Sequence, residues 1–319
     1  MDAYRDASQW RYLDRIVNKV ADGWHIWQIE DPDSIEKTGW VEGSGREWIR
    51  ELFEKAAIAS SYPPDDSFPY HLIFVSLQGK KSTELTPEKA AKFLSTPLTI
   101  LMENRFTDGE IFLNEVLNIL GHDKVNEQRV VAPDSICYDS QGGIGELPKL
   151  VSDYADRAYA DGIPIRVVVF TDSDGDIPGE IKPNVRLVQQ ACEDKGIMCW
   201  TLLKRTIENY IPDEVLDAWK PYPDSDKGRC IAAIKKLNEG QRNHYPMKKG
   251  LQIARANHSV QALYRGISDE DMVALSNGLG KDVIKKFQEF RDSLSVEALQ
   301  RRDGKRELDG LVKIIADAL

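Results

Sequence analysis

The chain has 319 residues, of which 41% are hydrophobic, and carries a formal net charge of −10 at pH 7. The hydrophobic content suffices for one large core or two to three modest ones, and no stretch approaches the roughly twenty apolar residues of a membrane span. The net charge argues against a protein that coats nucleic acid indiscriminately, because such binding depends on neutralising phosphates. The first residues include acids and lack the apolar segment of a secretory signal, so we expect a cytoplasmic protein whose four cysteines are reduced.

Residues 1–96 predict an N-terminal α+β extension. Helices are expected near residues 3–21 and 46–59, followed by a strand at 71–77 and a short helix at 87–94. Five of the seven tryptophans lie here, namely Trp10, Trp24, Trp27, Trp40 and Trp48. Tryptophans at this density serve a packed core or an interface, and we expect core packing for most of them.

An apolar run at residues 98–102 ends in Glu103, and Asp108 follows five residues later. Residues 110–120 then place apolar side chains near helical spacing, so the segment predicts a strand, an acidic turn and a helix. Weaker strand signals follow at 128–132 and 136–138. A glycine-rich turn at 141–146 precedes a predicted helix at 146–160. Such a turn can present backbone N–H groups to an anion, or can simply lead into a packing helix.

Residues 167–176 read VVVFTDSDGD, a buried parallel strand followed by Asp172, Asp174 and Asp176. Open α/β sheets bind ligands at the carboxyl ends of their strands, where these acids would lie. Carboxylates this close repel one another unless a cation lies between them, and hard oxygen ligands favour Mg²⁺ or Mn²⁺. The alternative is a solvated turn in which an Asp caps the next helix.

A helix at 185–195 and a strand at 197–203 come next, and the chain then passes through Lys204 and Arg205 to Glu208. Another strand end would bring Glu208 to the same edge as Glu103 and Asp172. The competing interpretation pairs Glu208 with Arg205 or Lys204 at the start of a helix.

The region after residue 212 is predicted to be mostly helical and contains a basic segment at residues 227–265. Nine basic residues stand there against a single acid, Glu239, and clustering of one sign is the electrostatic footprint of nucleic-acid binding. The predicted nucleic-acid-binding residues are Lys235, Lys236, Arg242, Lys248, Lys249 and Arg255. The aromatic and imidazole side chains expected to stack on bases are His244, Tyr245, His258 and Tyr264. A docking surface for an acidic protein is the alternative.

A glutamate after one strand and an Asp-x-Asp after a later strand resemble the TOPRIM family, the catalytic module of topoisomerases, DnaG-type primases and OLD-type nucleases. The resemblance implies a Rossmann-like α/β fold with a parallel sheet at residues 97–212, preceded by the extension at 1–96 and followed by a helical region at 213–319. It implies that Glu103, Asp172 and Asp174 hold one or two Mg²⁺ ions. Asp108, Asp176 and Glu208 are further candidate metal ligands. Many members read Val-Glu-Gly where this chain has Met102, Glu103 and Asn104.

The segment after residue 203 is similar to the end of the module in OLD-like nucleases, where a basic residue, an acid and an Asn-Tyr or Asn-Leu pair recur. In those proteins a downstream lysine assists cleavage, which makes Lys248 or its neighbour Lys249 a candidate here, with Lys248 taken as the catalytic residue. The alternative is a pair of lysines on a solvated surface. The implied activity is a Mg²⁺- or Mn²⁺-dependent endonuclease, with two ions, that cleaves phosphodiester bonds of DNA or tRNA.

OLD-like nucleases usually include an ABC-type ATPase, yet this chain has no Walker A sequence. We therefore expect a separate ATPase partner, as in two-component phage-defence systems such as PARIS, with this chain as the toxic nuclease and a homodimer as one arrangement to test. Two other classes stay open. One is a phosphatase of the haloacid dehalogenase kind with Asp172 as nucleophile. The other is a non-catalytic scaffold that binds nucleic acid or an ATPase.

Overall fold

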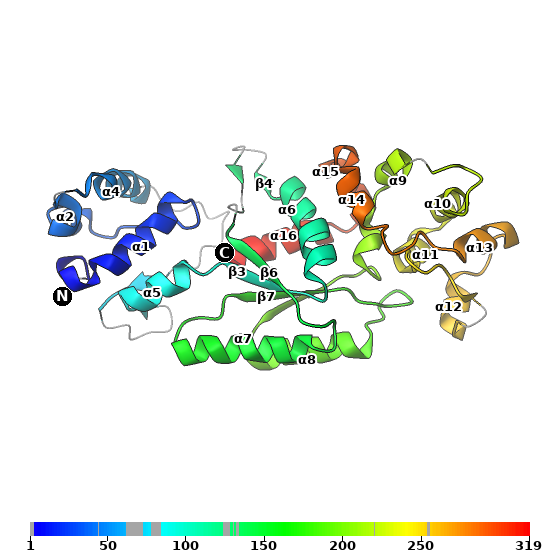
Figure 1. Cartoon of the computed structure of the whole chain (residues 1–319), viewed down its shortest axis with the longest axis horizontal. Coiled ribbons are helices and arrows are strands. Elements are labelled where there is room, and N and C mark those ends of the chain that lie inside the picture. Colours follow the sequence, from blue (N-terminus) through cyan, green and yellow to red (C-terminus); the bar gives the residue numbers. More distant parts are fainter. Residues whose placement is uncertain are drawn as a thin grey trace.

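The computed structural model describes residues 3–43, 45–61, 73–77, 84–123, 128–129, 131, 134–219, 221–253 and 256–319. Its centre is a four-stranded parallel sheet with the strand order β6-β3-β7-β8 (Figure 1). This arrangement confirms the predicted α/β class with a parallel sheet. The strands are β3 (Leu98–Leu101), β6 (Ile136–Asp139), β7 (Val167–Thr171) and β8 (Met198–Thr201).

Helices cover both faces of the sheet, because the side chains of each central strand alternate between two cores. In β7, Val168 and Phe170 join one core, whereas Val167 and Val169 join the other. Layers of helix are visible above and below the strands in Figure 1. One face packs against α7 (Leu147–Asp161) and α8 (Pro183–Lys195), and the other against α6 (Asn114–Leu120) and α16 (Glu307–Ala318).

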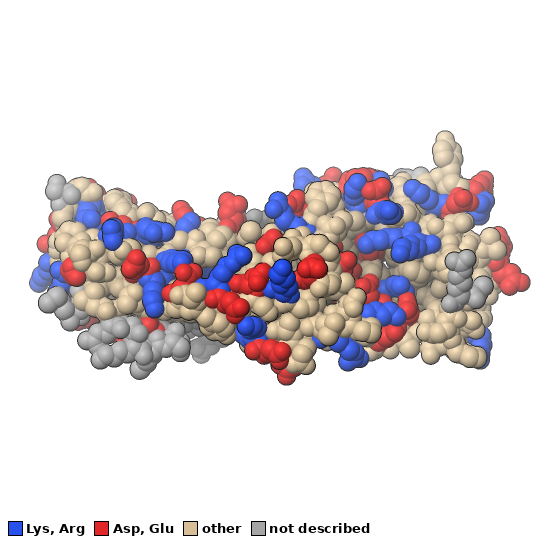
Figure 2. Space-filling view, turned by 60° about the horizontal axis from the view of Figure 1, so that its bottom comes forward, with Lys and Arg blue, Asp and Glu red and all other residues tan. Residues whose placement is uncertain are grey.

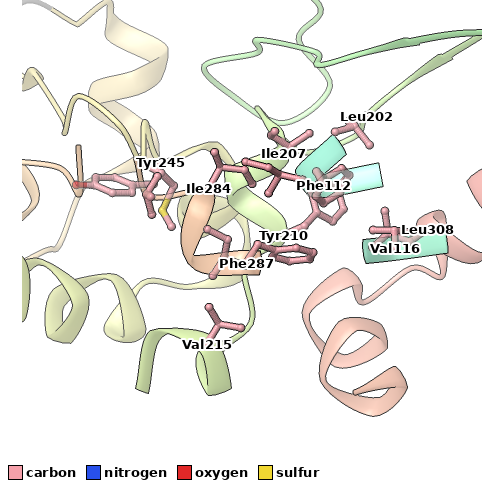
Figure 3. Close-up of a cluster of buried hydrophobic side chains, with 14 of the residues drawn as sticks. Phe112, Val116, Leu202, Ile207, Tyr210, Val215, Tyr245, Ile284, Phe287 and Leu308 are labelled. Atoms are coloured by element: carbon pink, nitrogen blue, oxygen red, sulfur yellow. The ribbon is translucent and has the colours of Figure 1, made fainter. Parts of the chain in front are cut away.

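The C-terminal region shares its core with the second face of the sheet. Figure 3 shows Phe112 near Tyr210 and Phe287, with ring centroids 5.8 Å and 5.5 Å away. The same apolar cluster continues to Tyr245 and Leu275, so residues 213–319 are packed onto the sheet rather than around a core of their own. The helices here are α9 (Asp213–Trp219), α10 (Asp226–Lys236), α11 (Glu239–His244), α12 (His258–Leu263), α13 (Asp269–Leu275), α14 (Lys285–Glu289) and α15 (Val296–Asp303).

The N-terminal region has a separate core in which tryptophans take part. Trp27 makes edge contacts with Trp40 and Phe53, and Trp40 is buried, as expected for core packing. The first helix begins at Trp10 rather than near Ala3, because two 3-10 turns precede it. The elements are α1 (Trp10–Ala21), α2 (Pro32–Glu36), α3 (Gly39–Glu42), α4 (Glu47–Ser60) and α5 (Pro87–Leu94), with the short parallel pair β1 (Phe74–Val75) and β2 (Glu84–Leu85).

Three further expected elements differ from their predicted extent. The strand expected at 71–77 lies within the described residues only from 73 on and extends over Phe74–Val75. The strand signal at 128–132 is described only at β5 (Gln128–Arg129), which pairs antiparallel with β4 (His122–Asp123) outside the main sheet. The predicted helix at 110–120 starts earlier, as a π-helical segment at Arg105–Leu113 that continues into α6. None of the helices in the described ranges combines the length and apolar content that crossing a membrane requires.

The π-helical segment packs closely on β6 through Gly109. A Cβ atom at this position would lie 2.7 Å from the Tyr138 ring and 2.8 Å from Met102 Sδ. We expect Gly109→Ala to lower the free energy of unfolding by about 1–3 kcal/mol, the usual cost of overpacking. Chemical denaturation measures the change. Gly145→Ala is the control, since its Cβ would meet nothing within 4 Å among the described atoms, and equal losses for both variants would contradict the packing argument.

Candidate functional site

The predicted acids leave neighbouring strands at one edge of the sheet. Leu101 of β3 pairs with Val169 of β7, so Glu103 and Asp172 follow strands that end side by side. Thr171 of β7 pairs with Thr201 of β8, the strand that leads to Glu208. Because all these strands run in the same direction, their carboxyl ends gather the three acidic segments, as expected for the ligand-binding edge of an open α/β sheet.

The Asp-x-Asp turn after β7 is held by the segment that follows β8. Asp172 Oδ1 accepts a hydrogen bond of 3.0 Å from the Ile207 N–H, and the buried Ser173 hydroxyl donates to the Lys204 carbonyl at 2.8 Å. Asp174 donates its N–H to the Arg205 carbonyl and adopts a left-handed backbone with φ of 52°. A non-glycine residue keeps this conformation where its surroundings impose it, which is common at functional sites.

The alternative of an Asp that caps the next helix is wrong. In this stretch, all of which the structure describes, α8 begins after Lys182 and no side chain caps its first turn. The turn from Asp172 to Asp174 is instead partly buried against residues 204–207. The acids of this turn therefore do not cap α8.

The acids raise one another's pKa values. Burial raises the pKa of Asp172 well above its usual value, and the negative charges of Asp108, Glu208 and Asp174 raise it further. Burial also raises the pKa of Asp108 to about 6, against the opposing hydrogen bond from Thr107. Glu103 has a raised pKa through burial first and then the charges of Asp174 and Asp108. These mutual effects mean that the five carboxylates share one electrostatic environment.

Lys248 faces this group of acids. Its ammonium forms an ion pair of 2.9 Å with Glu208, which is completely buried, whereas 40% of the Lys248 side chain is exposed. The predicted pairing of Glu208 with Arg205 or Lys204 is wrong, because Arg205 pairs with Asp176 and the Lys204 ammonium donates to the Asp303 carbonyl. Lys248, which the resemblance to OLD-like nucleases singles out, thus lies at the edge of the sheet that carries the acids.

In the described part of the chain, Asp176 is already paired with basic residues, unlike the other candidate ligands at Glu103, Asp172 and Asp174. Its carboxylate forms ion pairs with Lys182 and Arg205. Burial raises the pKa of Asp176, but the hydrogen bond from Lys182 and the charge of Arg205 outweigh burial, so that the pKa lies below its usual value. Its negative charge is therefore already compensated, and the geometry gives no support to its expected role as a metal ligand.

The donor set fits a hard divalent cation in chemistry and in charge. Carboxylate oxygens are the ligands that Mg²⁺ and Mn²⁺ prefer, and a cation would relieve the repulsion that raises the pKa values. Among the described residues, no three His, Cys, Asp or Glu side chains lie close enough to hold a metal ion as they stand. Glu103 lies on a turn at which the residue as a whole is exposed although its carboxyl group is partly desolvated, and metal binding would require the side chains to close around the ion.

The glycine-rich turn after β6 borders the same site. Gly142 and Gly143 have φ values of 73° and 93°, a conformation that glycine adopts without the strain of a side chain. A Cβ atom on Gly143 would lie 4.0 Å from Glu103 Oε1. The turn thus lies beside an expected metal ligand, and its contact with a phosphate stays a prediction.

The basic segment is largely neutralised by acids from neighbouring helices. Lys235 pairs with Asp217, and Lys236 with Asp271. Arg242 pairs with Asp213 and is only 13% exposed. Figure 2 shows basic and acidic side chains intermixed along the face in view rather than one large basic patch. The local excess of positive charge in the sequence therefore does not become an equal excess on the surface.

The prediction that the segment's aromatic residues stack on bases is wrong for most of them. Tyr245, Tyr264 and His244 are 0%, 2% and 4% exposed, so their rings belong to the core. His258 and Lys249 are exposed and stay candidates for contact with a nucleic acid. Arg255, also predicted to bind nucleic acid, lies outside the described residues.

No pattern in the sequence pointed to the part that α16 plays in holding the site. Glu307 Oε1 accepts a hydrogen bond of 2.7 Å from the Leu203 N–H, and the Tyr210 hydroxyl donates to Oε2. An acid in the first turn of a helix is usually interpreted as complementing the helix dipole, which hides such a role.

Comparisons with protein-family models, with curated proteins and with solved structures found no match to this chain.

Proposed function

We propose that this chain is a TOPRIM-type nuclease that cleaves phosphodiester bonds with Mg²⁺ or Mn²⁺. The observation that carries the proposal is that Glu103, Asp172 and Asp174 follow the carboxyl ends of two paired parallel strands. The raised pKa values of Glu103 and Asp172 and the nearby Lys248 ammonium support a site in which bound cations offset the charge of a phosphate. The same placement of acids is what the family resemblance implies.

Each residue of the site has a chemical role in this proposal. Glu103, Asp172 and Asp174 would hold the metal ions, with Asp108 as a further ligand. Bound metal ions would supply an activated water and offset the charge that develops on the phosphate. The Ile207 N–H keeps Asp172 in its orientation, and the ammonium of the partly exposed Lys248 side chain would donate to a phosphate or leaving-group oxygen.

The proposed biological setting is prokaryotic antiviral defence in the cytoplasm. The lack of a Walker A sequence supports a separate ABC-type ATPase that restrains or activates the nuclease. DNA and tRNA are the proposed substrates, and a homodimer is a further arrangement to test. The intermixed surface charges favour a site-directed contact over the broad electrostatic binding of a protein that coats nucleic acid.

A cleavage panel tests the proposed function. Plasmid DNA, single-stranded DNA and total tRNA would be incubated with Mg²⁺ or Mn²⁺ and the wild-type protein, Glu103→Ala, or the double variant Asp172→Ala/Asp174→Ala. We expect the wild type to cut one substrate class and both variants to lose the activity. Asp156→Asn is the control, because it breaks an exposed pair with Lys195 on α7 and α8. Cutting that survives in both site variants would refute the assignment.

Further assays on the same protein variants distinguish the nuclease from the phosphatase and from the scaffold. Hydrolysis of a small phosphate ester with covalent labelling of Asp172 by a phosphate analogue would favour the phosphatase. Binding of nucleic acid that persists without cleavage under all conditions, including in the presence of a candidate ATPase, would favour the scaffold. Toxicity in cells that is lost in the two site variants would connect the nuclease to defence.

A further inference from the structure

Residues 206–210 join the sheet to two separate segments of the C-terminal region. The Thr206 hydroxyl donates to Glu208 Oε2 at 2.6 Å, and the buried Asn209 side chain donates to the carbonyls of Arg242 and Tyr245, both at 2.9 Å. Tyr210 donates to Glu307 on α16. Consecutive side chains thus fix this turn from different directions, which leaves Glu208 little freedom to move.

The backbone that carries Lys248 is equally constrained. The Lys248 carbonyl accepts a hydrogen bond of 3.1 Å from Gly280, and the Leu279 N–H donates to Met247 at 2.7 Å. A Cβ atom on Gly278 would lie 2.4 Å from the Gly250 nitrogen and 2.8 Å from the Lys248 carbonyl oxygen. The loop is therefore packed against residues 278–280 with no room for a side chain at Gly278, and the flexible part of Lys248 is its four-carbon stem.

Each oxygen of Glu208 has a neighbour among the described residues, a hydrogen-bond donor for Oε2 and an ion-pair partner, without a hydrogen bond, for the buried Oε1. Oε2 accepts from Thr206, and Oε1 lies 2.9 Å from the Lys248 ammonium. Glu208 is 0% exposed, so a metal ion could reach it only by displacing one of these partners within the protein. A buried carboxylate needs a paired cation to offset its lost hydration, and Lys248 supplies that charge.

We propose that Glu208 is the positioning residue of Lys248 rather than a metal ligand. The proposal rests on the proposed function, because it gives Lys248 the contact with phosphate. The buried carboxylate holds the ammonium end of a long, flexible side chain that is 40% exposed. Such pairing reduces the number of conformations that Lys248 must lose when substrate binds, and places its charge where the acids would hold the metal.

Kinetics of single and double variants test the positioning role. Glu208→Gln keeps the size of the side chain and the Thr206 contact, and we expect kcat to fall by about 10- to 100-fold with KM changed less than about threefold. Lys248→Met should lower kcat by about 100-fold or more. In the Lys248→Met background, adding Glu208→Gln should cost less than about twofold further, because the residue it positions is gone. Multiplying effects in the double variant would overturn the proposal.

Two further measurements, one of metal affinity and one of lysine reactivity, do not depend on nuclease activity. The first is Mn²⁺ affinity by calorimetry, which we expect to be unchanged within about twofold in Glu208→Gln, since orienting Lys248 does not require contact with the ion. A loss of tenfold or more would make Glu208 a ligand and overturn the proposal. Asp156→Asn, which removes an acid from an exposed lysine pair, is the matched control.

The second measurement follows the reaction of Lys248 with an amine-acylating reagent by mass spectrometry. The exposed neighbour Lys249 serves as the internal reference. We expect Glu208→Gln to speed acylation of Lys248 severalfold relative to Lys249, and Glu208→Asp to fall between. An unchanged ratio would overturn the pairing. If the ratio rises and Mn²⁺ affinity holds while no polynucleotide is cut, the positioning role stands and the proposed function fails.

Discussion

Asp172→Asn is expected to abolish metal-dependent cleavage while stabilising the metal-free protein at neutral pH. The amide oxygen can still accept the hydrogen bond from the Ile207 N–H, so the turn should keep its shape. The substitution removes one negative charge from a group of acids that raise one another's pKa values. We expect cleavage to fall by about a thousandfold or more and the free energy of unfolding to rise by about 1 kcal/mol, the size of change typical where function opposes stability.

Cleavage assays and chemical denaturation of the same preparations would measure both effects. Asp156→Asn serves as the control, because its carboxylate lies in an exposed ion pair and should change neither quantity by much. A variant that still cuts would contradict the role of Asp172 as a metal ligand. A variant that is less stable than the wild type without metal at neutral pH would contradict the repulsion among the acids.

The stabilisation by Mn²⁺ is expected to grow with pH. The raised pKa of Asp108, about 6 in the folded protein against an ordinary 3.8, means that the folded state binds a proton that the unfolded state has released. Its contribution to stability is therefore present below pH 3.8 and is lost as pH rises through about 6. Asp172 and Glu103 have the same direction of shift and add to this loss.

A metal ion competes with those protons for the same oxygens, so its binding strengthens as the acids ionise. We expect saturating Mn²⁺ to raise Tm at least about 3 °C more at pH 8 than at pH 5. Thermal unfolding with and without the ion measures the difference, and Asp172→Asn should lose most of the increment at pH 8. An increment that is equal at both pH values would show that ionisation of these acids does not govern metal binding.

The strands and the core of the site could be predicted from local patterns. Short, largely apolar runs at 98–102 and 167–171 can satisfy the hydrogen bonds of their backbone and bury their side chains together as strands between two layers. Acids at the ends of such strands must meet at one edge when the strands are parallel neighbours. The local pattern therefore predicts that Glu103, Asp172 and Asp174 lie at one edge of the sheet, whereas their role as metal ligands stays a proposal that rests on the family resemblance.

The tertiary structure decided how the remaining charged residues are used. Asp176 and Glu208 both follow sheet strands, yet Asp176 pairs with Arg205 and Lys182, whereas Glu208 pairs with Lys248, forty residues further along the chain. Acids on α9 and α13 neutralise lysines that form a basic run in the sequence, and Tyr245 and Tyr264 join the core. Hydrophobic periodicity determines which side of an element faces inward, but the partner of each charge depends on which helices pack against it, and that is decided by contacts between residues far apart in the chain.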